Sequence, residues 1–153
     1  MKMLDRKIQR IGYVLFLGFF TSLFLSAKTN AKIVTPKSVE GYLLIQKQLA
    51  ADSFEGVVPA ASEIGKNEKG ELSLAAAKLS KSKNIEEARE NFKKVSDLLI
   101  AGTSEKERMG AKVAYCPMAQ AQWLQLGDTL KNPYYGASML ECGRFESKSP
   151  SKK

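Results

Sequence analysis

The chain lacks histidine altogether, and it contains only two cysteines and one tryptophan in 153 residues. Without imidazole it lacks the usual general base, the catalytic triads that depend on histidine, and the common zinc sites. Its acidic residues also show no paired spacing typical of acid–base catalysis. The sequence therefore predicts a protein that is not an enzyme.

Long apolar runs are missing except near the N-terminus. There a basic leader precedes residues 11–25 (IGYVLFLGFFTSLFL), and small and polar residues follow, with Ala31 as a plausible cleavage position. This three-part pattern predicts a secretory signal peptide over residues 1–31. A retained membrane anchor is the alternative, because the apolar run is only slightly shorter than a bilayer-spanning helix. We therefore expect an exported, periplasmic protein that meets a membrane only through an uncleaved leader.

A strong excess of one charge is missing once the leader is set aside. The whole chain carries a net charge of +8, and removing five basic residues and one acidic residue with residues 1–31 lowers it to +4. Lysine and glutamate alternate along what remains. Nucleic-acid binding requires a concentrated basic stripe, so this class of function is excluded.

Hydrophobic spacing predicts helices over most of the remaining chain. Residues 32–38 are expected to form a linker, residues 39–145 a helical domain, and residues 146–153 a disordered tail. Apolar positions three and four apart mark helices that begin near Val39, Val57 and Leu72. A fourth helix follows Asn84, a good N-cap residue. We predict a mainly α fold, a small antiparallel four-helix bundle with an irregular Cys/Met-containing C-terminal segment.

That C-terminal segment holds both cysteines, each close to a methionine: Cys116 with Met118, and Met139 with Cys142. Thiolate and thioether sulfur are the ligands that Cu(I) and Ag(I) prefer. Side chains two positions apart share one face of an extended strand, and a spacing of three suits one turn of helix. If the chain folds back after Asn132, the four sulfurs converge into a soft-metal site.

A disulfide is the competing interpretation of the same residues. Two cysteines in an exported protein are expected to pair, and a Cys116–Cys142 bridge would close about 26 residues and stabilise the fold by about 3 kcal/mol. The bridge and the metal site exclude each other in one molecule. The methionines are equally suited to filling gaps in a core. Trp123, expected in a single helical turn, would either pack in the core or stack over the ion.

The stretches YCPM (115–118), WLQ (123–125) and NPYYGASMLECG (132–143) resemble an exported bacterial domain-of-unknown-function family. The upstream stretches YLLIQKQLAADS (42–53) and IEEARENFKKVSDLLI (85–100) carry the same resemblance, which covers about residues 38–145. Members of that family also occur fused to the periplasmic adaptor subunits of copper and silver efflux systems. The resemblance implies a small helical domain that handles heavy metals, with Cys116, Met118, Met139 and Cys142 as ligands and an efflux adaptor as a possible partner.

We therefore expect a periplasmic protein that binds Cu(I) or Ag(I) and is linked to heavy-metal efflux or homeostasis. The alternative is an exported helical protein, stapled by a disulfide, that has an interaction or structural role and no metal.

Overall fold

The computed structural model of the chain describes residues 34–147. The predicted signal peptide and residues 148–153 of the predicted tail lie outside the described residues. Four α-helices come first: α1 (Pro36–Ala50), α2 (Val57–Asn67), α3 (Gly70–Leu79) and α4 (Ile85–Gly102). Two short 3-10 helices, η1 (Glu105–Arg108) and η2 (Gly136–Met139), and three strands follow: β1 (Lys112–Cys116), β2 (Ala121–Gln125) and β3 (Arg144–Phe145).

Side chains cap the free backbone N–H groups at the starts of α1 and α4. Thr35 caps α1 by accepting from the N–H of Ser38, with Pro36 in the first helical position, where its missing N–H is harmless. Residues 36–38, expected in the linker, are therefore the first turn of α1. At α4 the Asn84 side chain accepts from the N–H of Glu87 at 2.9 Å, as expected for its N-cap.

The prediction of a four-helix bundle with an irregular C-terminal segment is wrong, because this segment forms an antiparallel sheet with strand order β2-β1-β3. Ala114 in β1 pairs with Trp123 in β2 on one side and with Phe145 in β3 on the other. The expected helical turn around Trp123 is a strand. Runs of five residues are too short to show a clear period, and a strand depends on partners elsewhere in the chain.

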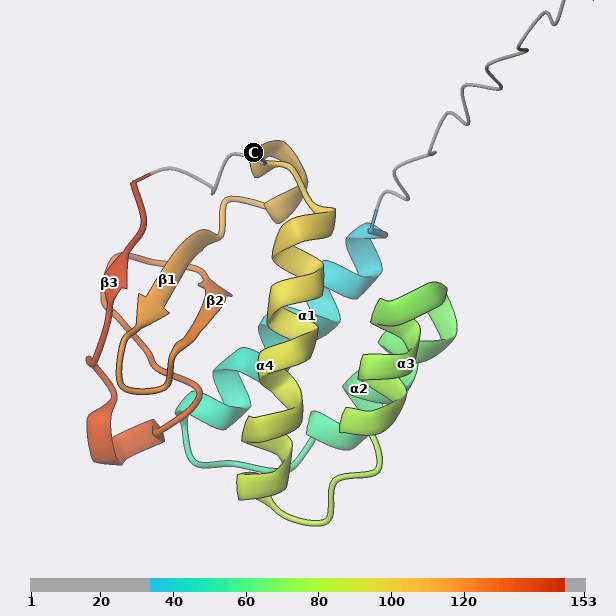
Figure 1. Cartoon of the computed structure of the whole chain (residues 1–153), viewed down its shortest axis with the longest axis horizontal. Helices are drawn as coiled ribbons and strands as arrows, with labels where there is room; N and C mark the ends of the chain where they lie inside the picture. Colours follow the sequence, from blue (N-terminus) through green and yellow to red (C-terminus); the bar gives the residue numbers. More distant parts are fainter. Residues whose placement is uncertain (1–33, 148–153) are drawn as a thin grey trace, which may run out of the picture. The chain divides into compact units, whose positions relative to one another are not determined.

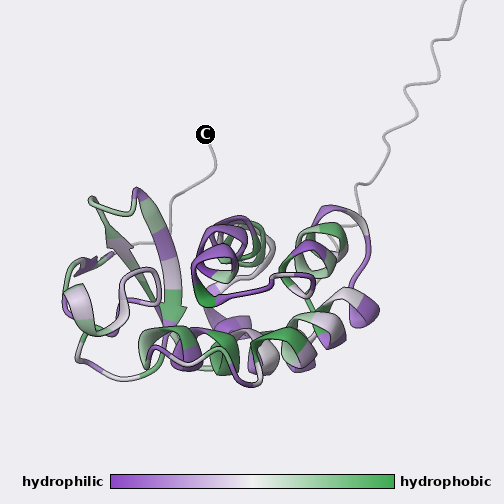
Figure 2. Cartoon of the chain, turned by 90° about the horizontal axis from the view of Figure 1, so that it is seen from below, coloured by the Kyte–Doolittle hydropathy of each residue, from purple (hydrophilic) through white to green (hydrophobic). Residues whose placement is uncertain are grey.

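The helices and the sheet are packed around helix α4. Helix α4 contacts α3 and strand β2, while α1 contacts both α2 and β2. Figures 1 and 2 show the sheet on one side of α4 and the α2–α3 pair on the other. Figure 2 also shows hydrophobic and hydrophilic residues alternating around the helices, which is the pattern of helices with one buried face.

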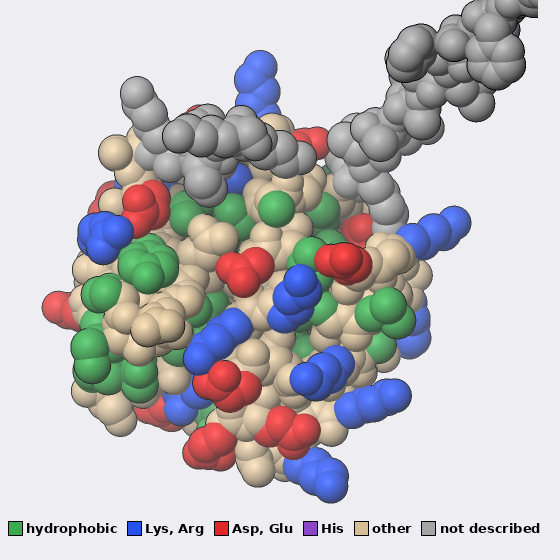
Figure 3. Space-filling model, viewed as in Figure 1, with side chains coloured by type: hydrophobic (Ala, Val, Ile, Leu, Met, Phe, Trp, Pro, Cys, Tyr) green, Lys and Arg blue, Asp and Glu red, His purple; other side chains and the backbone are tan. Residues whose placement is uncertain are grey.

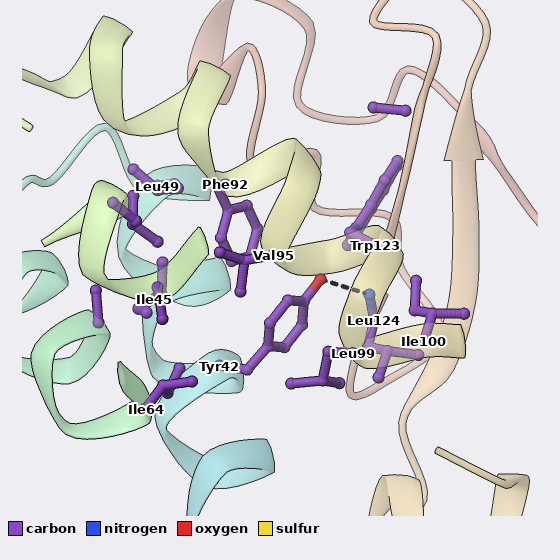
Figure 4. Packing of buried hydrophobic residues seen from close by; sticks show 14 of the residues in the cluster. Tyr42, Ile45, Leu49, Ile64, Phe92, Val95, Leu99, Ile100, Trp123 and Leu124 are labelled. Atoms are coloured by element: carbon purple, nitrogen blue, oxygen red, sulfur yellow. Dashed lines mark hydrogen bonds between the residues drawn. The ribbon is translucent and has the colours of Figure 1, made fainter. Parts of the chain in front are cut away.

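The core joins helices to sheet through large aromatic side chains (Figure 4). Tyr42 and Phe92 stack with ring centroids 4.8 Å apart, and Tyr134 meets the edge of Trp123 at 5.9 Å. The Tyr42 hydroxyl lies 2.8 Å from the Ser96 hydroxyl. Burial of these rings stabilises the fold, while the hydroxyl contacts satisfy polar atoms that water cannot reach.

Charged side chains of both signs are interspersed on the face shown in Figure 3. Within residues 34–147, no helix combines the length and the apolar character needed to cross a bilayer.

Candidate dithiol site

The two cysteines lie side by side, with their sulfur atoms 3.0 Å apart and both thiols free. Cys116 is the last residue of β1, and Cys142 stands two residues before β3. Because β3 pairs antiparallel with β1 through Tyr115 and Arg144, continuing the register brings residue 142 beside the end of β1. Pairing of β1 with β3, which the sequence did not predict, therefore brings the two cysteines together. We call this pair the dithiol site.

The two thiols differ in exposure and in acidity. Cys116 is fully buried, whereas Cys142 is half-buried. Burial raises the pKa of the Cys116 thiol, but hydrogen bonds from Cys142, from two backbone N–H groups and from the Asn132 side chain outweigh it, so this pKa lies below its ordinary value. One of those N–H groups is that of Ala119, 3.4 Å from the sulfur. The hydrogen bond to Cys116, then burial, raises the pKa of Cys142.

These opposite shifts mean that the two thiols are not equivalent: Cys116 is the more acidic, and Cys142 is the more exposed. The backbone N–H of Ala119, at the tip of the β1–β2 hairpin, donates to the Cys116 sulfur and would stabilise its thiolate. A reagent would meet Cys142 first, because Cys116 is fully buried.

Asn132 is bonded to the Cys142 segment. Its side chain is fully buried, and its Nδ2 donates to the carbonyl of Cys142 at 2.9 Å. Its amide also helps to lower the pKa of the Cys116 thiol. Its Oδ1 accepts from the N–H of Tyr134 at 2.8 Å, which closes a tight turn. Sequence reasoning assigned Asn132 to turn chemistry alone, and nothing in its residue type distinguishes the second role.

An ion pair anchors the loop that carries Asn132. Arg89 on α4 donates through Nη2 to Asp52 at 2.5 Å and through Nε to the carbonyl of Pro133 at 3.1 Å. Asp52 in turn accepts from the N–H of Ala137 at 2.9 Å. Gly136 lies directly over this pair, where an added Cβ would overlap the Asp52 carboxylate. The segment between Asn132 and Cys142 is thereby fixed to the helices.

The two methionines border the site differently. Met118, at the tip of the β1–β2 hairpin, is 65% exposed, and its backbone N–H helps to lower the pKa of both thiols. Met139 is half-buried, and its carbonyl accepts from the N–H of Cys142 at 3.0 Å, so the two share one turn as expected from their spacing. The backbones of both methionines thus touch the dithiol site.

Trp123 lies in the core. It is fully buried, and its indole N–H donates to Gln125 at 2.9 Å. The edge of its ring faces Gly143, where an added Cβ would lie 2.9 Å from the ring. This core position agrees with the packing interpretation of Trp123. The ring also lies beside Gly143, the residue that follows Cys142.

Within residues 34–147, no three His, Cys, Asp or Glu side chains converge into a set that could hold a metal ion. Any ion at the dithiol site would therefore be held by two thiolates, with thioether sulfur from Met118 or Met139 as the available supplement. Comparison of the chain with protein-family models, with curated proteins and with solved structures gave no match.

Proposed function

We propose that this protein binds one soft monovalent ion, Cu(I) or Ag(I), between Cys116 and Cys142. In this proposal the protein is exported and buffers the ion or passes it to an efflux system in the periplasm. The observation that carries the proposal is the 3.0 Å separation of the two sulfurs, which lets one ion contact both of them. Two soft thiolates favour such an ion over Mg²⁺ or Ca²⁺, which prefer oxygen.

Charge supports a monovalent ion in particular. Two thiolates and one monovalent cation together carry a net charge of −1. The backbone N–H of Ala119, 3.4 Å from the Cys116 sulfur, would help to stabilise that charge. A structural zinc site would need four nitrogen or sulfur ligands, and the chain has no histidine and no third cysteine.

Thioether sulfur would complete the coordination. The exposed side chain of Met118 can rotate over the sulfurs without disturbing the core, because its backbone is already held at the site. Met139 stands in the same turn as Cys142 and is the second candidate. Both are adaptable side chains with polarisable sulfur.

A disulfide is the second candidate, favoured by the same separation. The sulfurs need to approach from 3.0 Å to the bonded distance of about 2.05 Å, and a bridge would connect two segments 26 positions apart. Its role would be structural, and it would remove both thiolates from metal binding.

The deciding experiment uses the protein purified as its cell processes it. After full reduction, free thiols are counted and the protein is titrated with Cu(I) against a chromophoric Cu(I) chelator. We expect one Cu(I) per chain, no stoichiometric binding in Cys116→Ser or Cys142→Ser, and weaker binding in the Met118→Leu/Met139→Leu double variant. Met109→Leu, at another exposed methionine, is the matched control and should bind like wild type.

Two results would decide against the proposal. Fully reduced wild type that takes up neither Cu(I) nor Ag(I) rejects metal binding. Zero free thiols before reduction, together with stability that is lost on reduction, supports the disulfide instead. Mass spectrometry of the same sample tests export, since removal of residues 1–31 is expected.

A further inference from the structure

Asn132 is a buried side chain whose polar contacts all lie at the dithiol site or in its own turn. A primary amide has two N–H donors and one acceptor oxygen. Here one N–H donates to the Cys142 carbonyl at 2.9 Å, and the oxygen accepts from the N–H of Tyr134 at 2.8 Å. The same amide also helps to lower the pKa of the Cys116 thiol. One buried side chain therefore ties the Cys142 segment to the Asn132 turn.

The backbone of Asn132 is fixed as firmly as its side chain. Its N–H donates to the carbonyl of Leu140 at 2.7 Å, and its carbonyl accepts from the N–H of Gly136 at 3.1 Å. These bonds tie residue 132 to the loop that ends at Cys142, and Arg89 anchors the same loop to α4. The backbone of Cys142 is held at its N–H, which donates to the carbonyl of Met139, and at its carbonyl, which accepts from this amide. The amide is therefore the bond that joins the Cys142 backbone to the Asn132 turn.

We propose that Asn132 is the positioning residue of the dithiol site, because its buried amide sets the position of the Cys142 segment relative to the sulfur of Cys116. The expected effect of Asn132 on metal affinity rests on the proposed function. Its expected effect on the spacing of the two thiols does not, and a separate measurement tests it.

Asn132→Ser is the test variant. A serine hydroxyl still accepts from the N–H of Tyr134 and preserves the turn, but the shorter side chain loses the bond to the Cys142 carbonyl. Asn91→Ser is the matched control, since Asn91 is a buried asparagine whose amide donates to Ser82 at 3.0 Å, away from the cysteines. If circular dichroism shows that Asn132→Ser does not fold, Asn132→Asp replaces it, with Asn91→Asp as control, because the carboxylate keeps the acceptor and lacks the donors.

Two affinities are measured on reduced, folded protein. The first is for Cu(I), by chelator competition. The second is for phenylarsine oxide, which bridges two close thiols by forming two As–S bonds and releasing one water, with no change in oxidation state. We expect Asn132→Ser to lower Cu(I) affinity about 10- to 100-fold, as loss of an outer partner of metal ligands does. We expect arsenical affinity to fall about tenfold or more, because the second thiol is no longer held at high effective concentration.

Each outcome decides one point. Losses in Asn132→Ser, with Asn91→Ser within twofold of wild type, support the positioning role. Arsenical affinity within twofold of wild type in Asn132→Ser overturns it, as do equal losses in Asn91→Ser, which would point to general destabilisation. If arsenical affinity falls but Cu(I) binds to neither wild type nor variant, the positioning role stands and the proposed function is rejected.

Discussion

The hydroxyl of Tyr42, on helix α1, accepts a hydrogen bond at 3.0 Å from the backbone N–H of Leu124, in strand β2 (Figure 4). The two residues are 82 positions apart in the sequence. Their contact joins the first helix to the sheet inside the core, where an N–H without a partner is costly. This bond therefore connects helix α1 to strand β2 within the shared core.

Tyr42→Phe should lower the free energy of unfolding by about 1–3 kcal/mol, because the N–H of Leu124 stays buried and loses its partner. Ser96 is less affected, since it keeps the hydroxyl of Tyr134 at 3.2 Å. Urea unfolding followed by circular dichroism measures the change. Tyr135→Phe, which removes a hydroxyl contact at an exposed site, should stay within about 0.5 kcal/mol of wild type. Equal effects for the two variants would contradict this interpretation.

Gly143→Ala should destabilise the protein more than Gly127→Ala. Both glycines have positive φ, +143° and +83°, so alanine is strained at either position. At Gly143 the new Cβ would also lie 2.9 Å from the Trp123 ring and from the carbonyl oxygen of Tyr115, whereas at Gly127 it meets nothing within 4 Å. The excess is expected to be about 1–3 kcal/mol, the usual cost of overpacking. Chemical unfolding of both variants measures it, and a difference near zero would show that the ring can move aside.

Acid should weaken the fold partly through Asp52. The hydrogen bond from the N–H of Ala137, then the one from Arg89, holds the pKa of this carboxyl below its ordinary value of 3.8. The folded state thus binds this proton less tightly than the unfolded state, so the stabilisation is present above about pH 4 and is lost as the pH falls through the lowered pKa. Thermal unfolding from pH 6 to pH 2.5 should show a steeper acid decline in wild type than in Asp52→Asn. Parallel declines would refute the assignment.

Cys142 should react with iodoacetamide before Cys116 in reduced, folded protein. The lower pKa of Cys116 favours its thiolate, but the side chain is fully buried, which slows its reaction with the reagent. Peptide mapping by mass spectrometry at short times gives the order. In Cys142→Ser, Cys116 should react more slowly in folded protein than in denaturant. Modification of Cys116 first would mean that the hairpin tip opens readily.

The helices could be expected from the sequence because their evidence is local. Tyr42, Ile45 and Leu49 are spaced to share one helical face, and all three are fully buried. Asn84 caps α4 through a side chain three residues from its partner. Such signals need no knowledge of the rest of the chain.

The sheet and the dithiol site could not be expected in the same way. β1 and β2 are five residues each and β3 only two, and their residues include alanine and glutamine, which do not favour strands on their own. Asn132-Pro133 indicated a turn, which is present, but its sequence carried no sign of the bond to Cys142.

The amino-acid sequence by itself determined the four amphipathic helices, the basic leader with its apolar run, and the presence of two cysteines each near a methionine. Only the tertiary structure decided that the C-terminal segment forms strands and that the two sulfurs lie 3.0 Å apart. The physical reason is the range of the interactions involved. A helix closes its hydrogen bonds within four residues, whereas a strand and a two-cysteine site depend on partners that only chain folding brings together.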